Sequence, residues 1–251
     1  MKRRRISRAH VTCAAPVKIS TFLLLGCVLF GGLWGCGGSG GGTSEKLPER
    51  LRIVHVAPDA GPLSVILGED AAVESLPYGG FTEYLSAPEG KEVRIRVYSE
   101  SEVIPIVDEQ KEILSGKDYS LFLFEEDGSD AVAIQLGTDT NTAPDEGQFR
   151  LRVGNFSPTN ATVDIYLLKP DGRVSDSSPA AAAVAFKAFT KYFDIDQGEF
   201  VVKVTAEGSK TVLLDTGVLT GEDGDVNTLV VLEKTGGGKP LSSSYIHDAG
   251  L

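Results

Sequence analysis

Few side chains of this sequence have the types and spacing that chemistry requires. His55 lies four residues before Asp59, and a histidine oriented by a carboxylate can act as a general base beside a nucleophile. The neighbouring sequence offers no such nucleophile, and Asn155 takes the position of His55 in a second copy of the motif. We therefore predict that both residues form hydrogen bonds that steady the turns at Pro58 and Pro158. We predict no catalytic residue and no enzymatic activity.

A glycine-rich segment contains two formal catalytic motifs. Residues 37–41 match the Gly-x-Ser-x-Gly of a hydrolase, and residues 35–40 match the Gly-x-Gly-x-x-Gly of a dinucleotide-binding loop. Both mechanisms require a strand before the motif and a helix after it, and this segment has neither flank. We interpret the segment as a tether and predict no cofactor.

One acidic loop has the oxygen-rich composition of a calcium site. Residues 221–227 read Gly-Glu-Asp-Gly-Asp-Val-Asn, but they lack the ligand spacing and the final glutamate of an EF-hand. We predict a solvated hairpin turn here and no metal site.

The residues considered so far belong to a sequence that repeats itself. Leu-Arg-Ile-Val-His-Val-Ala-Pro at 51–58 returns as Leu-Arg-Val-Gly-Asn-Phe-Ser-Pro at 151–158, and Phe-Thr-x-Tyr at 81–84 returns at 189–192. The offset grows from 100 (51 to 151) to 108 (81 to 189), which predicts an eight-residue insertion in the second copy. The run Pro179–Ala183 is the candidate insertion, and we leave its helical propensity open. A period this long suits two domains rather than a solenoid.

Each copy has the pattern of short strands. Val93, Ile95 and Val97 alternate with arginines, as in a half-buried strand, and turn signals such as Pro-Asp-Ala-Gly separate the strands. We predict two tandem immunoglobulin-like β-sandwich domains, at 49–137 and 148–247, with a linker at 138–147.

Two kinds of apolar residue need separate explanations. The strands at 119–124 and 229–232 are apolar on both faces, so the second face is covered either by the neighbouring domain or by a loop, and we favour the loop. The Phe-Thr-x-Tyr motifs could stack a ligand, but we favour core aromatics with a tethered hydroxyl.

The N-terminal segment has the pattern of an export signal. Residues 1–35 hold six basic residues and no acidic one, and the apolar run at 19–34 is slightly short for a membrane span of about 20 residues. Leu-Trp-Gly-Cys, ending at Cys36, resembles the lipobox of bacterial lipoproteins, which implies cleavage before Cys36 and lipidation of its sulfur. Cys27 is the alternative, and an uncleaved anchor is the plainer one. Residues 36–48 then form a Gly/Ser-rich tether.

Charge and cysteine content limit the partners. The chain has 24 basic and 35 acidic residues, and loss of the six basic signal residues changes the net charge from −11 to −17. Such an acidic protein is not expected to bind nucleic acid. After cleavage Cys36 is the only cysteine left, so no disulfide is expected.

Four ordered motifs resemble one known family. They are Val54–Ala60, Pro77–Tyr84, Ala87–Ile95 and Leu114–Tyr119. Together they look like the bacterial domain-of-unknown-function 4397 family, well over 50–135 and more weakly over 148–234. The resemblance implies an exported, often lipid-anchored protein of tandem β-sandwiches, and it transfers no activity.

These observations predict a lipid-anchored protein of the bacterial cell envelope, in the outer membrane if the cell has two. Its expected role is a non-catalytic binding or structural module for a protein or glycan partner, with membrane contact through the lipid. The alternatives are an envelope hydrolase that uses surface carboxylates, which requires a suitably spaced pair, or a binder of a small ligand in the interdomain cleft.

Overall fold

The computed structural model describes residues 50–249 except 88–91, 101, 127–128 and 130. The predicted signal (1–35), the tether (36–48) and both candidate lipidation sites, Cys36 and Cys27, lie outside these residues. Within the described part, no helix has the length and apolar character needed to span a membrane.

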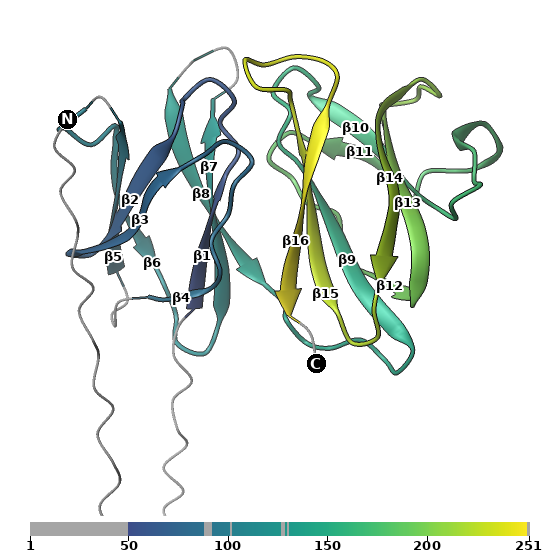
Figure 1. Cartoon of the computed structure of the whole chain (residues 1–251), viewed down its shortest axis with the longest axis horizontal. Helices are drawn as coiled ribbons and strands as arrows, with labels where there is room; N and C mark the ends of the chain where they lie inside the picture. The colour runs from purple at the N-terminus through teal and green to yellow at the C-terminus, as the bar shows by residue number, and fades with distance from the viewer. Residues whose placement is uncertain (1–49, 88–91, 101, 127–128, 130, 250–251) are drawn as a thin grey trace, which may run out of the picture. The chain divides into compact units, whose positions relative to one another are not determined.

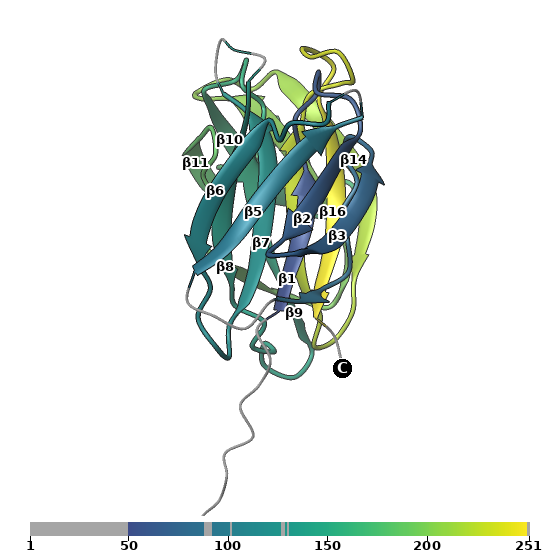
Figure 2. The same cartoon turned by 90° about the vertical axis from the view of Figure 1, so that its left-hand side faces the viewer.

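The first body consists of two four-stranded sheets (Figures 1 and 2). All neighbouring strands are antiparallel except β1 and β7, which are parallel. One sheet has the order β4 (Leu85–Ser86), β1 (Arg50–His55), β7 (Asp118–Glu125), β8 (Val132–Asp139); the other has the order β3 (Asp70–Leu76), β2 (Leu63–Leu67), β5 (Glu92–Ser99), β6 (Val107–Glu112).

The second body has the same strand order, again with one parallel pair, β9 and β15. A short 3-10 helix, Val174–Asp176, follows β10. One sheet has the order β12 (Phe193–Asp196), β9 (Gln148–Asn155), β15 (Val226–Leu232), β16 (Ser242–Ala249); the other has the order β11 (Ala181–Ala185), β10 (Thr162–Leu168), β13 (Gly198–Ala206), β14 (Val212–Gly221).

The prediction of all-β sandwiches is confirmed, whereas the strand order differs from that of an immunoglobulin constant domain. In that domain the first two strands share a sheet. Here β1 and β2 lie in different sheets, as do β9 and β10. β8 ends at Asp139 and β16 at Ala249, so each final strand runs two residues beyond the domain bounds expected from the sequence.

Alternation of apolar and polar residues places the core of each sandwich between its two sheets. Val93, Ile95 and Val97 of β5 are buried, while Arg94 is exposed on the opposite face. Each sandwich has its own cluster of buried apolar residues. The period-two pattern therefore predicted the correct face of this strand.

The strands that are apolar on both faces, β7 and β15, share a third cluster. Phe122 and Phe124 of β7 pack with Phe156 and with Val230 of β15, and the rings of Phe122 and Phe156 stack with centroids 4.8 Å apart. The second face of β7 is covered by the other sandwich and not by a loop of its own domain. The covering rings, Phe156, Phe186 and Phe189, lie between the strands of that sandwich.

The alanine run forms a strand, not the insertion. β11 at Ala181–Ala185 corresponds to β3, and the extra residues precede it: twelve residues (169–180) join β10 to β11, whereas two (68–69) join β2 to β3. Ser75 and Ala183 occupy the same position in the two copies, with φ of 51° and 53°. In each copy a side chain of the neighbouring strand accepts the hydrogen bond of that N–H: Ser64 at 3.0 Å and Asp164 at 2.9 Å.

The replacement of Val54 by Gly154 in the second copy explains why the matching residues Phe81 and Phe189 differ in burial. Phe189 bridges to Gly154 and packs in the shared cluster, whereas Phe81 bridges to Val54 and is 38 % exposed. Gly154 leaves space that the Phe189 ring fills, and in the first copy the side chain of Val54 occupies that space. The prediction of a core aromatic is therefore correct for Phe189 and wrong for Phe81.

We predict that Gly154→Ala destabilises the protein by about 1–3 kcal/mol, because the added methyl overpacks the site. A Cβ at this position would lie 2.4 Å from a ring carbon of Phe189. Urea unfolding followed by far-UV circular dichroism measures the effect.

Gly137→Ala on β8 is the matched control, since its Cβ would lie 3.7 Å from Phe122, an ordinary contact. Equal unfolding midpoints for the two variants would contradict the packing argument.

Candidate functional site

His55 and Asn155 make equivalent hydrogen bonds at the ends of β1 and β9. His55 Nδ1 accepts the Ala57 N–H at 3.2 Å, and its Nε2 bonds the Gly61 carbonyl at 2.7 Å. Asn155 Oδ1 accepts the Ser157 N–H at 3.1 Å, and the Asn155 side-chain amide donates to the Asn160 carbonyl at 3.0 Å. The prediction that both residues steady these turns is confirmed.

Two buried arginines meet carboxylates across the boundary between the sandwiches. Arg52 of β1 pairs with Asp248 of β16 at 2.6 Å, and Arg152 of β9 pairs with Asp139 of β8. All four side chains are almost inaccessible to solvent. The pairing is reciprocal, because each sandwich supplies one arginine and one aspartate to the other. These two buried ion pairs therefore hold the two sandwiches together.

A hydroxyl in each sandwich links its arginine to its aspartate. Arg52 Nε donates to Ser120 at 2.7 Å, and Ser120 donates to Asp139 at 2.7 Å. In the second sandwich the matching residue is Thr228, which accepts from Arg152 at 2.9 Å and donates to Asp248. Each buried carboxylate thus has a partner in both sandwiches, as buried charges require.

The tyrosines of the Phe-Thr-x-Tyr motifs stack on these arginines. The guanidinium carbon of Arg52 lies 5.0 Å from the ring centroid of Tyr84, and that of Arg152 lies 5.1 Å from the ring of Tyr192. The Tyr84 hydroxyl donates to Asp139 at 2.6 Å. The motif stacks a cation, as its aromatic composition allowed, but the cation belongs to the chain itself.

Burial and charge act in opposite directions on this network. Burial raises the pKa of the Asp248 carboxyl, and Arg52 and Thr228 offset only part of that rise. Burial would lower the pKa of Arg52, but attraction to Asp248 and Asp139 outweighs it and raises that pKa. A carboxyl with a raised pKa can mark a catalytic acid. Here the Asp248 carboxyl pairs with the buried Arg52 of the other sandwich, so its role is to hold the two sandwiches together.

Sequence reasoning missed this network, although a signal was present. Arg52 and Arg152 hold the same place in the repeated motif, each between apolar residues of a buried strand. Such a charge must be paired. The identity of the partners, Asp139 and Asp248, could not be read from the sequence because they come from the opposite body.

The acidic loop at 221–227 connects β14 to β15, which belong to different sheets, so it is a crossover turn rather than a hairpin. Asp223 uses its carboxylate to accept the N–H of Gly147 at 2.7 Å. Among the described residues, no group of three or more His, Cys, Asp or Glu side chains could hold a metal ion.

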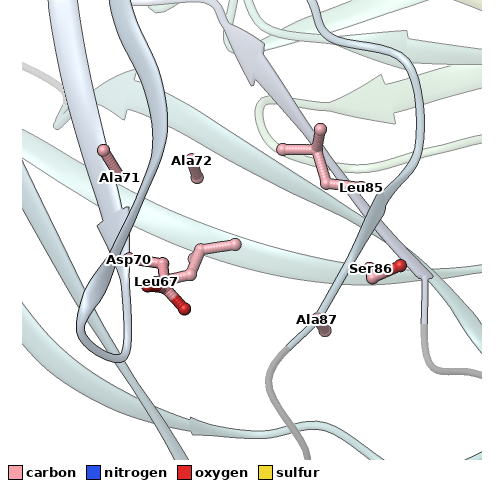
Figure 3. A pocket seen from close by; sticks show the side chains of 7 residues that line it. All are labelled: Leu67, Asp70, Ala71, Ala72, Leu85, Ser86 and Ala87. Atoms are coloured by element: carbon pink, nitrogen blue, oxygen red, sulfur yellow. The ribbon is translucent and has the colours of Figure 1, made fainter.

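A cavity of about 410 Å³ opens between the β2–β3 turn and β4 of the first sandwich. Figure 3 shows its side chains coming from the two segments 67–72 and 85–87. Most of them are aliphatic, and Asp70 is its one carboxylate. A cavity of about 340 Å³ lies at the matching place in the second sandwich, beside Leu167 and Ile195. Such openings at equivalent edges follow from the shared architecture.

Two further cavities are lined by more polar side chains. One of about 400 Å³ draws residues from both sandwiches, including Pro58, Pro158 and Glu233. Burial opposes ionisation of Glu233, but hydrogen bonds from Thr159, Gly238 and Ser157 outweigh it and lower its pKa. The other, about 660 Å³, lies along β2, β3 and β5. We call this second cavity the β5 depression; its lining includes Ser64, Glu74, Ser75, Tyr98, Glu100 and Glu102.

Comparison with known proteins identifies one domain. The family model described as "Domain of unknown function (DUF4397)" matches residues 49–166, which span the first sandwich and continue into β9 and β10. This segment therefore carries a DUF4397 domain, as its motifs predicted. A search of curated proteins finds no match.

The solved structures that resemble this chain do so distantly. A product complex of the glycogen-degrading pneumococcal virulence factor SpuA is 12 % identical with a TM-score of 0.27, and the match covers 78 % of this chain and 21 % of SpuA. Family 41 carbohydrate-binding modules from streptococcal virulence factors are 13 % identical with a TM-score of 0.26, over 78 % of this chain and 97 % of theirs. The Bacillus anthracis TIE protein is 10 % identical with a TM-score of 0.25, over 75 % of this chain and 34 % of its own.

We predict that Asp248→Ala destabilises the protein by about 3–5 kcal/mol, because it removes the closer of the two carboxylates that pair with the buried Arg52 and leaves only Asp139, at 3.8 Å. Urea unfolding of the full chain gives the free energy. Asp108→Ala is the control, since it breaks the solvent-exposed pair with Arg94 at 2.6 Å and should change stability little. A similar loss in both variants would show that the interface is not the source of the effect.

The stability of the protein should depend on the protonation of His55. Burial lowers the pKa of His55 from its ordinary value of 6.5, against the opposing hydrogen bond to Gly61. The unfolded chain therefore binds the proton more readily, and stability falls as the pH drops below that ordinary value.

His55→Asn installs the side chain that the second copy already uses, which does not titrate. The free energy of unfolding should then depend less on pH between about pH 5 and pH 7. An unchanged slope in that range, measured by urea unfolding, would contradict the assignment.

Proposed function

We propose that this protein is a lipid-anchored component of the bacterial cell envelope and acts there as a non-catalytic binding or structural module. The signal at 1–35, lipidated Cys36 and the tether at 36–48 would place two copies of one domain beyond the membrane surface. Two acyl chains or more would make the attachment stable where one would be marginal. Gly37 after the lipidated cysteine fits outer-membrane sorting in a cell with two membranes.

The observation that carries the proposal is the use of the matched polar residues. His55 and Asn155 hold turns, and Arg52 and Arg152 pair with aspartates of the opposite sandwich. Groups that could do chemistry thus stabilise the fold in both copies. A body joined this way suits a rigid element that presents its outer surface to a partner, such as a protein or a glycan.

A hydrolase would behave differently in a direct assay. Turnover of a model ester, peptide or glycoside by the full-length protein, abolished by His55→Asn with the fold intact, would overturn the non-catalytic assignment.

We predict that Cys36→Ser moves the protein out of the membrane fraction, because the sulfur that would carry the lipid is gone. Intact-mass analysis of the wild-type protein should show acyl chains on a mature chain that begins at Cys36. Cys27→Ser is the matched control and should leave mass and fractionation unchanged. The reverse pattern would assign lipidation to Cys27, and an unmodified mass would indicate an uncleaved anchor.

A further inference from the structure

The connection between β5 and β6 presents exposed apolar side chains. Val103 is 93 % exposed and Ile104 is 70 % exposed, and Ile106 is exposed as well. The Ile106 N–H donates to the Val97 carbonyl at 2.8 Å, which fixes the returning end of the loop. We call residues 103–106 the apolar tip.

The corresponding connection in the second sandwich is polar. Residues 207–211, between β13 and β14, read Glu-Gly-Ser-Lys-Thr. Lys210 donates to the carbonyls of Val174 and Ser177 at 2.9 and 2.6 Å, so this connection is held by contacts of its own. The same fold thus forms with a polar loop at this place. The apolar tip is not required for folding, and exposed apolar side chains of this kind mark interaction surfaces.

The β5 depression continues from the tip and is acidic. Glu74, Glu100 and Glu102 line it together with the ring of Tyr98, and no Lys or Arg is among its lining residues. Glu100 accepts the Ser75 hydroxyl at 2.6 Å, a bond that leaves its charge uncompensated.

Two basic residues of the same sheet are closely paired, and the third, Arg96, donates to the Gly68 carbonyl at 2.7 Å and lies 4.0 Å from Glu69. Arg94 pairs with Asp108 and Lys111 with Glu109, both at 2.6 Å. The carboxylates of the depression therefore retain their negative charge towards solvent, and they attract a cationic partner while repelling an anionic one.

We propose that the apolar tip and the β5 depression together bind a polypeptide segment of a partner protein that combines apolar and basic residues. This inference rests on the proposed function as a binding module and names the chemical class of its partner. Apolar residues of the partner cover Val103 and Ile104, and its lysines or arginines meet Glu74 and Glu102. The half-buried ring of Tyr98 offers a face for a guanidinium.

Panning a random peptide library against the full-length protein in lipid nanodiscs tests the proposal. Empty nanodiscs are used first to remove peptides that bind lipid. The enriched peptides should contain both basic and apolar residues. Enrichment of acidic or purely polar peptides, or of none, would overturn the proposal, as would preferential binding of soluble oligosaccharides to the depression.

Variants locate the binding site of an enriched synthetic peptide. Val103→Ser combined with Ile104→Ser should weaken binding roughly tenfold, the loss expected when apolar contacts of this size are removed. Glu74→Gln combined with Glu102→Gln should weaken binding and reduce its dependence on salt.

Val218→Ser on β14 is the control, because Val218 is an apolar residue of the second sandwich that is 54 % exposed. The affinity of this variant for the peptide should match that of the wild type. Equal affinity of the tip variant and the control would overturn the inference. Since lipidation at Cys36 is measured by mass, that result would leave the assignment of the anchor standing.

Discussion

The reciprocal burial of Arg52 and Arg152 is the constraint on which the rest of the structure depends. A guanidinium inside protein requires a carboxylate, and each sandwich takes that carboxylate from the other: Asp248 for Arg52, and Asp139 for Arg152. Separating the two bodies would break both of these ion pairs. The pairing is self-complementary, as in an isologous dimer interface, although both halves belong to one chain.

Apolar packing around these pairs accounts for features that looked unrelated in the sequence. β7 and β15 are apolar on both faces because one face of each strand packs in the core of its own sandwich and the other face packs in the shared cluster. The tyrosines at 84 and 192 cover the arginines, so a motif that suggested ligand stacking serves the interface. The aromatic pairs in the cluster, such as Phe122 on Phe156, add specific geometry to area that is buried anyway.

The two copies agree where the fold needs them to and diverge elsewhere. The turn-holding residue is histidine in one and asparagine in the other, and both make the same kind of bonds. By contrast, Val54 is replaced by Gly154, which changes where a phenylalanine ring lies. The β5–β6 connection is apolar and exposed, whereas its counterpart is polar. A role that distinguishes the two sandwiches must lie in such differences.

The class of fold and the repeated strand pattern could be predicted from the sequence, because alternation and turn residues act over a few neighbouring positions. The sequence also predicted the roles of His55 and Asn155, because the turn-holding partners of both lie within six residues, although Asn155 also bonds the distant Val184 carbonyl. Tertiary structure alone decided that β1 pairs with β7, that Ala181–Ala185 is a strand, and that Asp139 and Asp248 pair with distant arginines. These outcomes depend on residues far apart in the chain, where local propensity carries no information and the complementarity of two buried surfaces selects the partners.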